Sequence, residues 1–343
     1  MKSHVFLPSL LVSPDWFADS SPPRLPAIES LLAHGRAQVG EEWPKPLLAR
    51  FGVGGGIAAI SAYGDAINTD EAGWMFAEPV HLQADRDTVN LFPASHLDVS
   101  ADEAAQLIDA LNANFEDRGL AFSIGASGRW YVRCDALELP QTTSIAAAQR
   151  GAVFEKLPQS TGKLSWKAIQ NEAQMLFHSH AVNEQREASR RLTINGLWFW
   201  GEGVLPTISM GSSSIGDVFG DAPLSNGLAK LTGAKSASLA QWDLVSDKSP
   251  ANDKLLLLDA LTAFHERGDM DGWGKAALAL DAQIFTRLLA SLRNGVINEV
   301  TLTLPRNRDS LVVTITARSL RGISGLWNNM TKRPLPFLES VHA

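Results

Sequence analysis

Cysteine is almost missing from this chain, and its absence limits both the compartment and the chemistry. Cys134 is the single cysteine in 343 residues, which excludes an internal disulfide framework and a cysteine-rich zinc site. Blocks of lysine or arginine are absent too, and the formal net charge is -7. A chain without a basic patch has no electrostatic basis for binding nucleic acid. We therefore expect a protein of a reducing compartment that does not bind nucleic acid.

Long hydrophobic runs are also lacking. The apolar run near the start, Val5 to Val12, is interrupted by Pro8 and is too short for a secretory leader or a membrane span. No other segment reaches about eighteen uninterrupted apolar residues. These absences predict a cytoplasmic protein that does not associate with membranes.

Strands alternate with helical stretches along most of the chain, an order typical of a parallel sheet covered by helices on both sides. The first strand is expected at Val5 to Val12. The first helix is expected at Ala27 to Val39, where Ile28 and Leu31 share one face. Later elements are expected as helix Ser165 to His180, strand Leu192 to Trp200, strand Lys254 to Leu261, helix Gly274 to Arg293, and a hairpin of Val296 to Leu304 with Ser310 to Ala317. The pattern predicts an α/β fold with a mainly parallel sheet flanked by helices.

The segment Asp85 to Gln170 interrupts this alternation with one helix followed by a hairpin. It predicts one inserted α+β domain. Ser100 and Glu103 form a plausible capping box for a helix through Asn114. A hairpin is expected next, formed by Ala121 to Ile124 and Arg129 to Cys134. We therefore expect a discontinuous core of residues 1–84 and 171–343, with residues 85–170 as the inserted domain.

Two neighbouring segments combine a polar helix end with an apolar strand that stops in glycines. They read His178-Ser-His-Ala-Val-Asn-Glu-Gln-Arg186 and Ile194-Asn-Gly-Leu-Trp-Phe-Trp-Gly-Glu-Gly203. Such a strand end is where α/β folds present a site. These two sequences resemble motifs of archaeal-type cofactor-independent phosphoglycerate mutases, which are members of the alkaline phosphatase superfamily. The motifs of the mutases are roughly H-P-V-N-x-x-R and A-N-x-I-W-x-W-G-Q-G. The matching residues are His180, Val182, Asn183, Arg186, Asn195, Trp198, Trp200, Gly201 and Gly203.

Three further segments match the same family in the same order. Gly54 to Asp65 is similar to G-S-D-x-A-x-L-x-x-L-G-Y-D, and Asn226 to Ala234 is similar to K-G-I-A-x-L-A-G-M. Leu255 to Asp281 is similar to the stretch that contains D-E-A-G-H-x-G-D. The resemblance implies an alkaline-phosphatase-like core, with an inserted domain that closes over the substrate.

The residues that the resemblance would make catalytic are replaced. Gly55 stands where the mutases have the serine that takes up the phosphoryl group, and Gly56 stands in the place of the next aspartate. The opening strand lacks the mutases' metal-binding aspartate, and Leu261 replaces the aspartate before His265. Metal-assisted phosphoryl transfer needs carboxylate and imidazole ligands that converge on one point. We therefore expect no catalytic residue, no metal site and no cofactor.

The polar residues that remain are candidates for binding a ligand. Asn183 and Arg186 lie three residues apart on one helical face, where an arginine fork can hold a carboxylate or phosphate. The structural alternative is that Arg186 pairs with Glu172 or Glu184. The ligand-binding candidates are His180, Asn183, Arg186, Asn195, Trp198 and Trp200. The two tryptophans alternate on a strand and share one face, which suits either ligand stacking or packing.

Three hypotheses about function follow. The first is a non-catalytic relative of the mutases, a pseudoenzyme that binds a small anionic metabolite or a protein partner. The whole chain is similar in texture to RpfE-type regulatory proteins of Gram-negative bacteria, which share the pattern at Arg129-Trp-Tyr131 and at the two central segments. The second hypothesis is an active phosphomutase or phosphatase with a rebuilt site, and the third is a structural or assembly protein.

Overall fold

The computed structural model of the protein describes residues 1–17, 21–86, 88–135, 139–149, 153–158, 165–208, 213–242 and 252–321. The chain forms two compact units, and each is described by itself. Unit 1 comprises Met1–Gly54 and Ile208–Ala343, and unit 2 comprises Gly55–Thr207. Within the described residues, no helix is long and apolar enough to cross a membrane.

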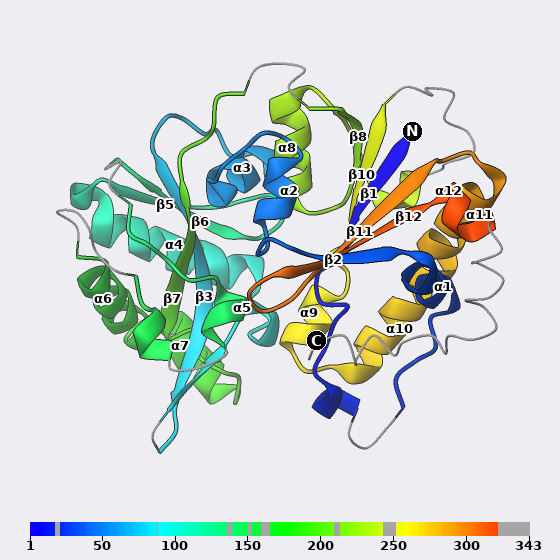
Figure 1. Ribbon diagram of the computed structural model, residues 1–343. Helices are drawn as coiled ribbons and strands as arrows, with labels where there is room; N and C mark the ends of the chain where they lie inside the picture. Colours follow the sequence, from blue (N-terminus) through cyan, green and yellow to red (C-terminus); the bar gives the residue numbers. More distant parts are fainter. Residues whose placement is uncertain are drawn as a thin grey trace. The chain divides into compact units, whose positions relative to one another are not determined.

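Unit 1 is built on a seven-stranded sheet with the order β2-β12-β11-β1-β10-β8-β9 (Figure 1). The strands are β1 (Lys2–Phe6), β2 (Arg36–Gly40), β8 (Ile215–Phe219), β9 (Lys235–Ala237), β10 (Asp253–Leu257), β11 (Glu299–Pro305) and β12 (Ser310–Thr316). β1 pairs in parallel with β10 and β11, and β10, β8 and β9 continue the parallel arrangement. The pairs β11–β12 and β12–β2 are antiparallel. The predicted α/β fold with a mainly parallel sheet is confirmed.

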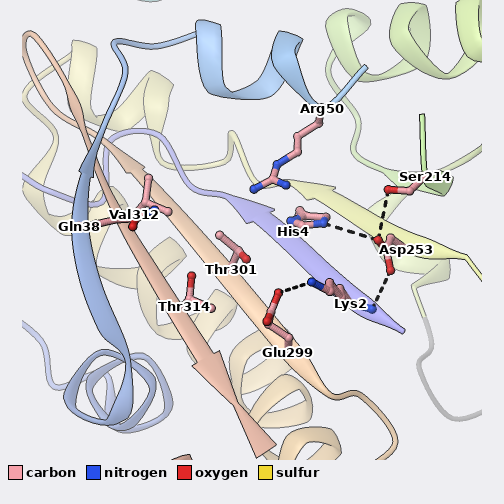
Figure 2. Close-up of a pocket in the computed structure, with 10 residues that line it drawn as sticks. All are labelled: Lys2, His4, Gln38, Arg50, Ser214, Asp253, Glu299, Thr301, Val312 and Thr314. Atoms are coloured by element: carbon pink, nitrogen blue, oxygen red, sulfur yellow. Dashed lines mark hydrogen bonds and ion pairs between the residues drawn. The ribbon is translucent and has the colours of Figure 1, made fainter. Parts of the chain in front are cut away.

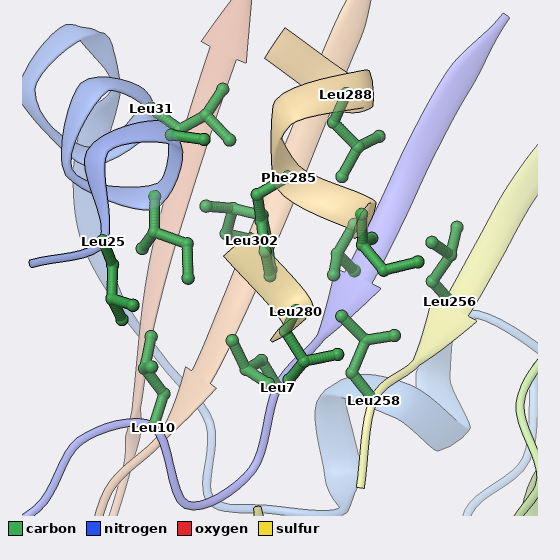
Figure 3. Packing of buried hydrophobic residues seen from close by; sticks show 14 of the residues in the cluster. Leu7, Leu10, Leu25, Leu31, Leu256, Leu258, Leu280, Phe285, Leu288 and Leu302 are labelled. Atoms are coloured by element: carbon green, nitrogen blue, oxygen red, sulfur yellow. The ribbon is translucent and has the colours of Figure 1, made fainter. Parts of the chain in front are cut away.

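One face of this sheet is buried under helices α1 (Pro26–His34), α10 (Met270–Leu280) and α11 (Thr286–Asn294). Their leucines pack on Leu256 and Leu302 of the sheet, as Figure 3 shows. Side chains alternate along a strand, so His4 and Thr301 lie on the opposite face. The other helical segments are η1 (Pro14–Phe17), α2 (Lys45–Ala49), α8 (Pro223–Thr232), η5 (Leu239–Gln241), α9 (Thr262–Glu266), η6 (Asp281–Phe285) and α12 (Ala317–Arg321). In Figure 1, α2 and α8 lie on the second side of the sheet.

Unit 2 contains a separate antiparallel sheet of five strands. They are β3 (Gly73–Ala84), β4 (Val89–Phe92), β5 (Leu120–Ile124), β6 (Trp130–Cys134) and β7 (Gly196–Gly203). The long β3 is central, because it pairs with β4, β6 and β7. This second, α+β unit agrees with the expected fold class.

Helices cover both faces of the second sheet. α4 (Ala101–Phe115) and α6 (Trp166–His178) bury one face around Trp130 and Phe199, and α3 (Ile57–Gly64) packs on Phe76 of the other. The remaining segments are η2 (Ala94–His96), η3 (Glu116–Arg118), α5 (Ile145–Ala148), η4 (Val153–Lys156) and α7 (Ala181–Ala188). The capping box at Ser100 and Glu103 is present at the start of α4, and β5 with β6 forms the expected hairpin.

Several elements differ from those expected. Unit 2 extends beyond the predicted insertion of residues 85–170 on both sides, because β3 and β7 pair with each other rather than with the strands of unit 1. The expected helix Ala27 to Val39 ends at His34, and residues 36–40 form the edge strand β2. The opening strand ends at Phe6, before Pro8. The long helix expected at Gly274 to Arg293 is continuous but contains the π-helical turn η6.

Candidate functional site

The segment that carries the family resemblance begins at the junction of α6 and α7 in unit 2. His180 is the N-cap of α7, and its Nδ1 accepts a hydrogen bond from the Val182 backbone N–H at 3.2 Å. Asn183 is 3% exposed. Its Nδ2 donates to the carbonyl oxygens of Phe177 and Ile194, each at 2.7 Å, and its Oδ1 accepts from the Ile194 N–H at 2.8 Å. Asn183 therefore ties the end of α6 to the segment that leads into β7.

Arg186 is the most deeply buried charged side chain of this region, with 1% exposure. Its Nε donates to the Leu192 carbonyl at 2.7 Å, and its Nη2 donates to the Leu97 carbonyl. Its Nη1 binds Oε2 of Glu103 at 2.8 Å. The alternative that paired Arg186 with Glu172 or Glu184 is wrong, because the partner is Glu103 from the first turn of α4 and Glu172 pairs with Arg118.

Glu103 receives several donors at once. It accepts from the Ser100 backbone N–H at 2.9 Å as part of the capping box, and from Nη1 of Arg191 at 2.9 Å. Burial works to raise the pKa of Glu103, but the Ser100 hydrogen bond and the charge of Arg186 outweigh it and hold the pKa below its ordinary value. Glu103 is thus a charged junction of α4, α7 and residue 191.

The side chains of Asn195, Trp198 and Trp200 also contact other residues of unit 2. The Asn195 side chain exchanges two hydrogen bonds with the backbone of Leu82, at 2.7 and 2.9 Å. Trp198 donates from Nε1 to the Thr143 carbonyl at 2.8 Å, and Trp200 packs on Phe76 with ring centroids 4.6 Å apart. The six candidates therefore divide into a polar group around α7, a backbone clamp at Asn195, and an aromatic face on β7.

Gly56 and Gly203, which lie in two of the segments that match the mutases, are in contact. Gly56 precedes α3 with φ of 74°, and a Cβ there would lie 2.4 Å from the Val204 carbonyl oxygen. A Cβ on Gly203 would lie 2.5 Å from the Gly56 Cα. Gly55, in contrast, has open space where its Cβ would be. The backbone after β7 thus occupies the place next to Gly56 where a side chain would begin.

A buried acid that the sequence did not single out lies beside this aromatic face. Glu78 of β3 is 13% exposed at its side chain, and its carboxylate is 3.9 Å from Nε of Arg129. Burial raises the pKa of Glu78, although the charge of Arg129 opposes the shift. The Arg129 guanidinium also lies over the Phe76 ring, 5.0 Å from its centroid. A lone acid in an apolar strand was the available signal for this pair.

Unit 1 has a polar pocket of about 320 Å³, called the His4 pocket (Figure 2). It opens at the amino ends of β1, β10 and β11, on the face away from the leucine core. Its lining is Lys2, His4, Gln38, Arg50, Ser214, Asp253, Glu299, Thr301, Val312 and Thr314. No local sequence pattern indicates this pocket, because strands far apart in the chain bring its residues together.

The charges of the His4 pocket are partly paired. Lys2 Nζ lies 3.0 Å from Glu299, and the Lys2 backbone N–H donates to Asp253 at 2.9 Å. His4 Nε2 is 4.0 Å from Asp253 Oδ2. Burial, and then the charge of Arg50, lower the pKa of His4 from 6.5 to about 4, although Asp253 opposes the shift. His4 is therefore a neutral imidazole near neutral pH.

The described residues contain no group of three or more histidine, cysteine, aspartate or glutamate side chains placed to hold a metal ion. The sulfur of Cys134 is buried in β6. Within the described residues, the polar side chains discussed above form hydrogen-bond clamps in unit 2 and a mixed-charge pocket in unit 1.

No protein-family model and no curated protein matches this sequence. Among solved structures, the cofactor-independent phosphoglycerate mutase of Thermoplasma acidophilum DSM 1728 aligns with a TM-score of 0.44 and 14% identity, over 99% of this chain and 98% of the mutase. The PH0037 protein of Pyrococcus horikoshii aligns with a TM-score of 0.51 and 12% identity, over 92% of this chain and 87% of that protein. At such identity, this chain is similar to the Pyrococcus protein in its fold.

Proposed function

We propose that this chain is a non-catalytic, phosphoglycerate mutase-like protein of the alkaline phosphatase superfamily, and that it acts in regulation by binding a small molecule or a protein partner. The resemblance of its motifs to the mutases and to RpfE-type regulatory proteins suggests the class. The contact between Gly56 and Val204 carries the proposal that catalysis is lost.

Gly55 and Gly56 stand where the mutases have a serine and an aspartate. Covalent phosphoryl transfer needs a nucleophile that holds the phosphoryl group between two steps, and Gly55 has no side chain to do so. The neighbouring Gly56 adopts a positive φ, and the Val204 carbonyl oxygen would be 2.4 Å from any Cβ. Neither of the two side chains that the mutases use here is present, and the second cannot be accommodated without a backbone shift.

The polar residues that survive from the motif serve the fold in this proposal. The side-chain amides of Asn183 and Asn195 form hydrogen bonds with backbone groups, and Arg186 donates to two carbonyl groups and one carboxylate. A buried polar group that is already hydrogen-bonded gains little from a ligand. The geometry therefore supports a structural role for these three, and we look for the binding site elsewhere.

The test is an assay of the purified protein for interconversion of 2- and 3-phosphoglycerate with added manganese, beside an active mutase. We expect no turnover above the rate without protein. Turnover comparable to that of the active mutase would overturn the proposal.

Two variants sharpen this assay. Gly55→Ser restores a hydroxyl in open space, so we expect an unchanged melting temperature. We still expect no turnover, because the aspartate at the place of Gly56 and the metal-binding aspartate of the opening strand are missing. Gly56→Ser should lower the melting temperature, because of the positive φ and the contact with Val204. Turnover that appears in Gly55→Ser would mean that the rest of a catalytic site is in place.

A further inference from the structure

The His4 pocket contains a buried polar atom that the chain leaves unused. The His4 side chain is only 5% exposed, and its Nδ1 is buried without a hydrogen-bond partner. Its other nitrogen is 4.0 Å from Asp253, too far for a hydrogen bond. Buried polar groups without partners are rare in folded proteins, and where they occur they often mark a place that a ligand or water fills.

The pocket also contains an unpaired cation. Arg50 is the C-cap of α2, and its side chain extends into the pocket above His4 in Figure 2. Within the described part of the chain, its guanidinium forms no hydrogen bond or ion pair. An arginine fork is suited to a carboxylate or phosphate, which it can bind through two parallel hydrogen bonds.

Two carboxylates lie on the other side of the pocket. Asp253 and Glu299 begin β10 and β11, and their side chains are 20% and 25% exposed. Lys2 is their main partner, through its ammonium group at Glu299 and its backbone N–H at Asp253. Carboxylates have several acceptor sites each, so both retain capacity for a further donor.

These charges select the class of ligand. A simple anion at Arg50 would also face Asp253 and Glu299, and a simple cation at the carboxylates would also face Arg50 and Lys2. A molecule with one charge of each sign is matched at both ends. The volume of about 320 Å³ is at the small end of ligand pockets.

We propose that the His4 pocket binds a small zwitterion such as a free amino acid, with its carboxylate on Arg50, its ammonium group on Asp253 and Glu299, and His4 as a further hydrogen-bond partner. This inference builds on the proposed function by naming the ligand class and the site. It does not depend on the outcome of the mutase assay.

The experiment is isothermal titration calorimetry of the full chain with each of the twenty standard L-amino acids, and with inorganic phosphate and spermidine as probes that carry only negative or only positive charge. We expect saturable binding of at least one amino acid and none of phosphate or spermidine. Binding of phosphate or spermidine alone, or of no probe at all, would overturn the proposal.

Derivatives and variants then locate the two ends of the ligand. The N-acetyl form and the amide of the best amino acid should each bind at least tenfold more weakly than the free amino acid. Arg50→Gln should lower the affinity for the free amino acid by a similar factor but should not change the already low affinity for the amide. Arg36→Gln, an exposed arginine on β2 outside the pocket, should change neither.

Glu299→Gln tests the ammonium end in the same way. This variant should have a lower affinity for the free amino acid but an unchanged affinity for the N-acetyl form. Circular dichroism spectra of the variants that match the parent would exclude misfolding as the cause of lost affinity. Amino-acid binding that persists at full strength in both Arg50→Gln and Glu299→Gln would overturn the assignment to this pocket, even if the protein proves to have no mutase activity.

Discussion

Glu103 accepts hydrogen bonds from two arginines that differ in their exposure. Arg186 is 1% exposed and Arg191 is 39% exposed at its side chain. Removal of a buried partner leaves an uncompensated charge in the interior, whereas an exposed pair contributes little. The two residues therefore form a matched pair for testing whether the central motif is structural.

We predict that Arg186→Ala lowers the free energy of unfolding by about 3–5 kcal/mol, while Arg191→Ala lowers it by less than about 1 kcal/mol. Urea denaturation followed by tryptophan fluorescence measures both. If Arg186→Ala were as mild as Arg191→Ala, Arg186 would be available for a ligand, and the structural role assigned to it would be wrong.

The lowered pKa of the buried His4 imidazole makes the stability of the protein depend on pH. The folded-state pKa is about 4, lowered first by burial and then by Arg50, while Asp253 and Glu299 oppose the shift and Lys2 adds to it. An unfolded chain takes up this proton near pH 6.5, so stability falls as the pH is lowered from about 6.5 to about 4. The loss attributable to His4 should reach about 3 kcal/mol at the acid end.

The imidazole C–H resonances, titrated by NMR and assigned with His4→Gln, give the pKa directly. The same variant should show a weaker loss of stability with falling pH than the parent, because its side chain does not titrate. A His4 pKa at or above 6.5 would contradict the burial and charge argument.

Helix α1 obtains its N-terminal cap from a distant helix. Its N-cap residue Leu25 has no side-chain acceptor, but Asp281 accepts hydrogen bonds from the backbone N–H groups of Ala27, at 3.2 Å, and Ile28, at 2.8 Å. Asp281 begins the π-helical turn η6, which places its carboxylate at the start of α1. A negative charge at this end also interacts favourably with the helix dipole.

We predict that Asp281→Ala lowers the free energy of unfolding by about 1–3 kcal/mol, because two buried N–H groups lose their acceptor. Asp271→Ala, an exposed acid in the first turn of α10, is the control and should cost less than about 1 kcal/mol. Chemical denaturation compares the two. Equal effects would show that the acceptor at α1 is dispensable.

The elements that the sequence predicts well are those with local signals. The capping box at Ser100 and Glu103 and the hairpin of β5 and β6 depend on residues close together in the chain. Arg186 shows the limit of such signals. Its spacing from Asn183 indicates a shared helical face, but its partner Glu103 is 83 residues away, and no periodicity encodes that distance.

The same limit applies to strands. A strand is expected at Leu192 to Trp200, where β7 lies, but hydrophobic pattern does not say which sheet a strand joins, and β7 pairs with β3 in unit 2. Residues 36–40 continue a helical spacing, yet their backbone pairs with β12 and becomes a strand. The His4 pocket is formed by strands that begin at residues 2, 253 and 299, so its composition is visible only once the sheet is assembled.

Unit 2 has the properties of an independent folding unit. It has its own buried cores around Trp130 and Phe76, and Gly56 near its start touches Val204 near its end. We predict that residues 55–207 expressed alone fold and melt cooperatively. The shorter fragment 85–170 lacks β3 and β7, which carry the centre of the sheet, and should stay unfolded. Circular dichroism melts of both fragments decide the matter, and a folded 85–170 would favour the narrower insertion.

The order of the strands in unit 1 has a consequence for synthesis on the ribosome. β1 ends at Phe6, long before its two neighbours, β10 and β11, which begin at residues 253 and 299. At about 5–20 residues per second, the backbone of β1 waits roughly 12–50 s for β10 and roughly 15–60 s for β11, and the residues of unit 2 are made in between. The nascent chain therefore carries β1 without its neighbouring strands while about 250 further residues are made, and a chaperone that binds such apolar segments near the exit tunnel is expected to raise the yield of folded protein.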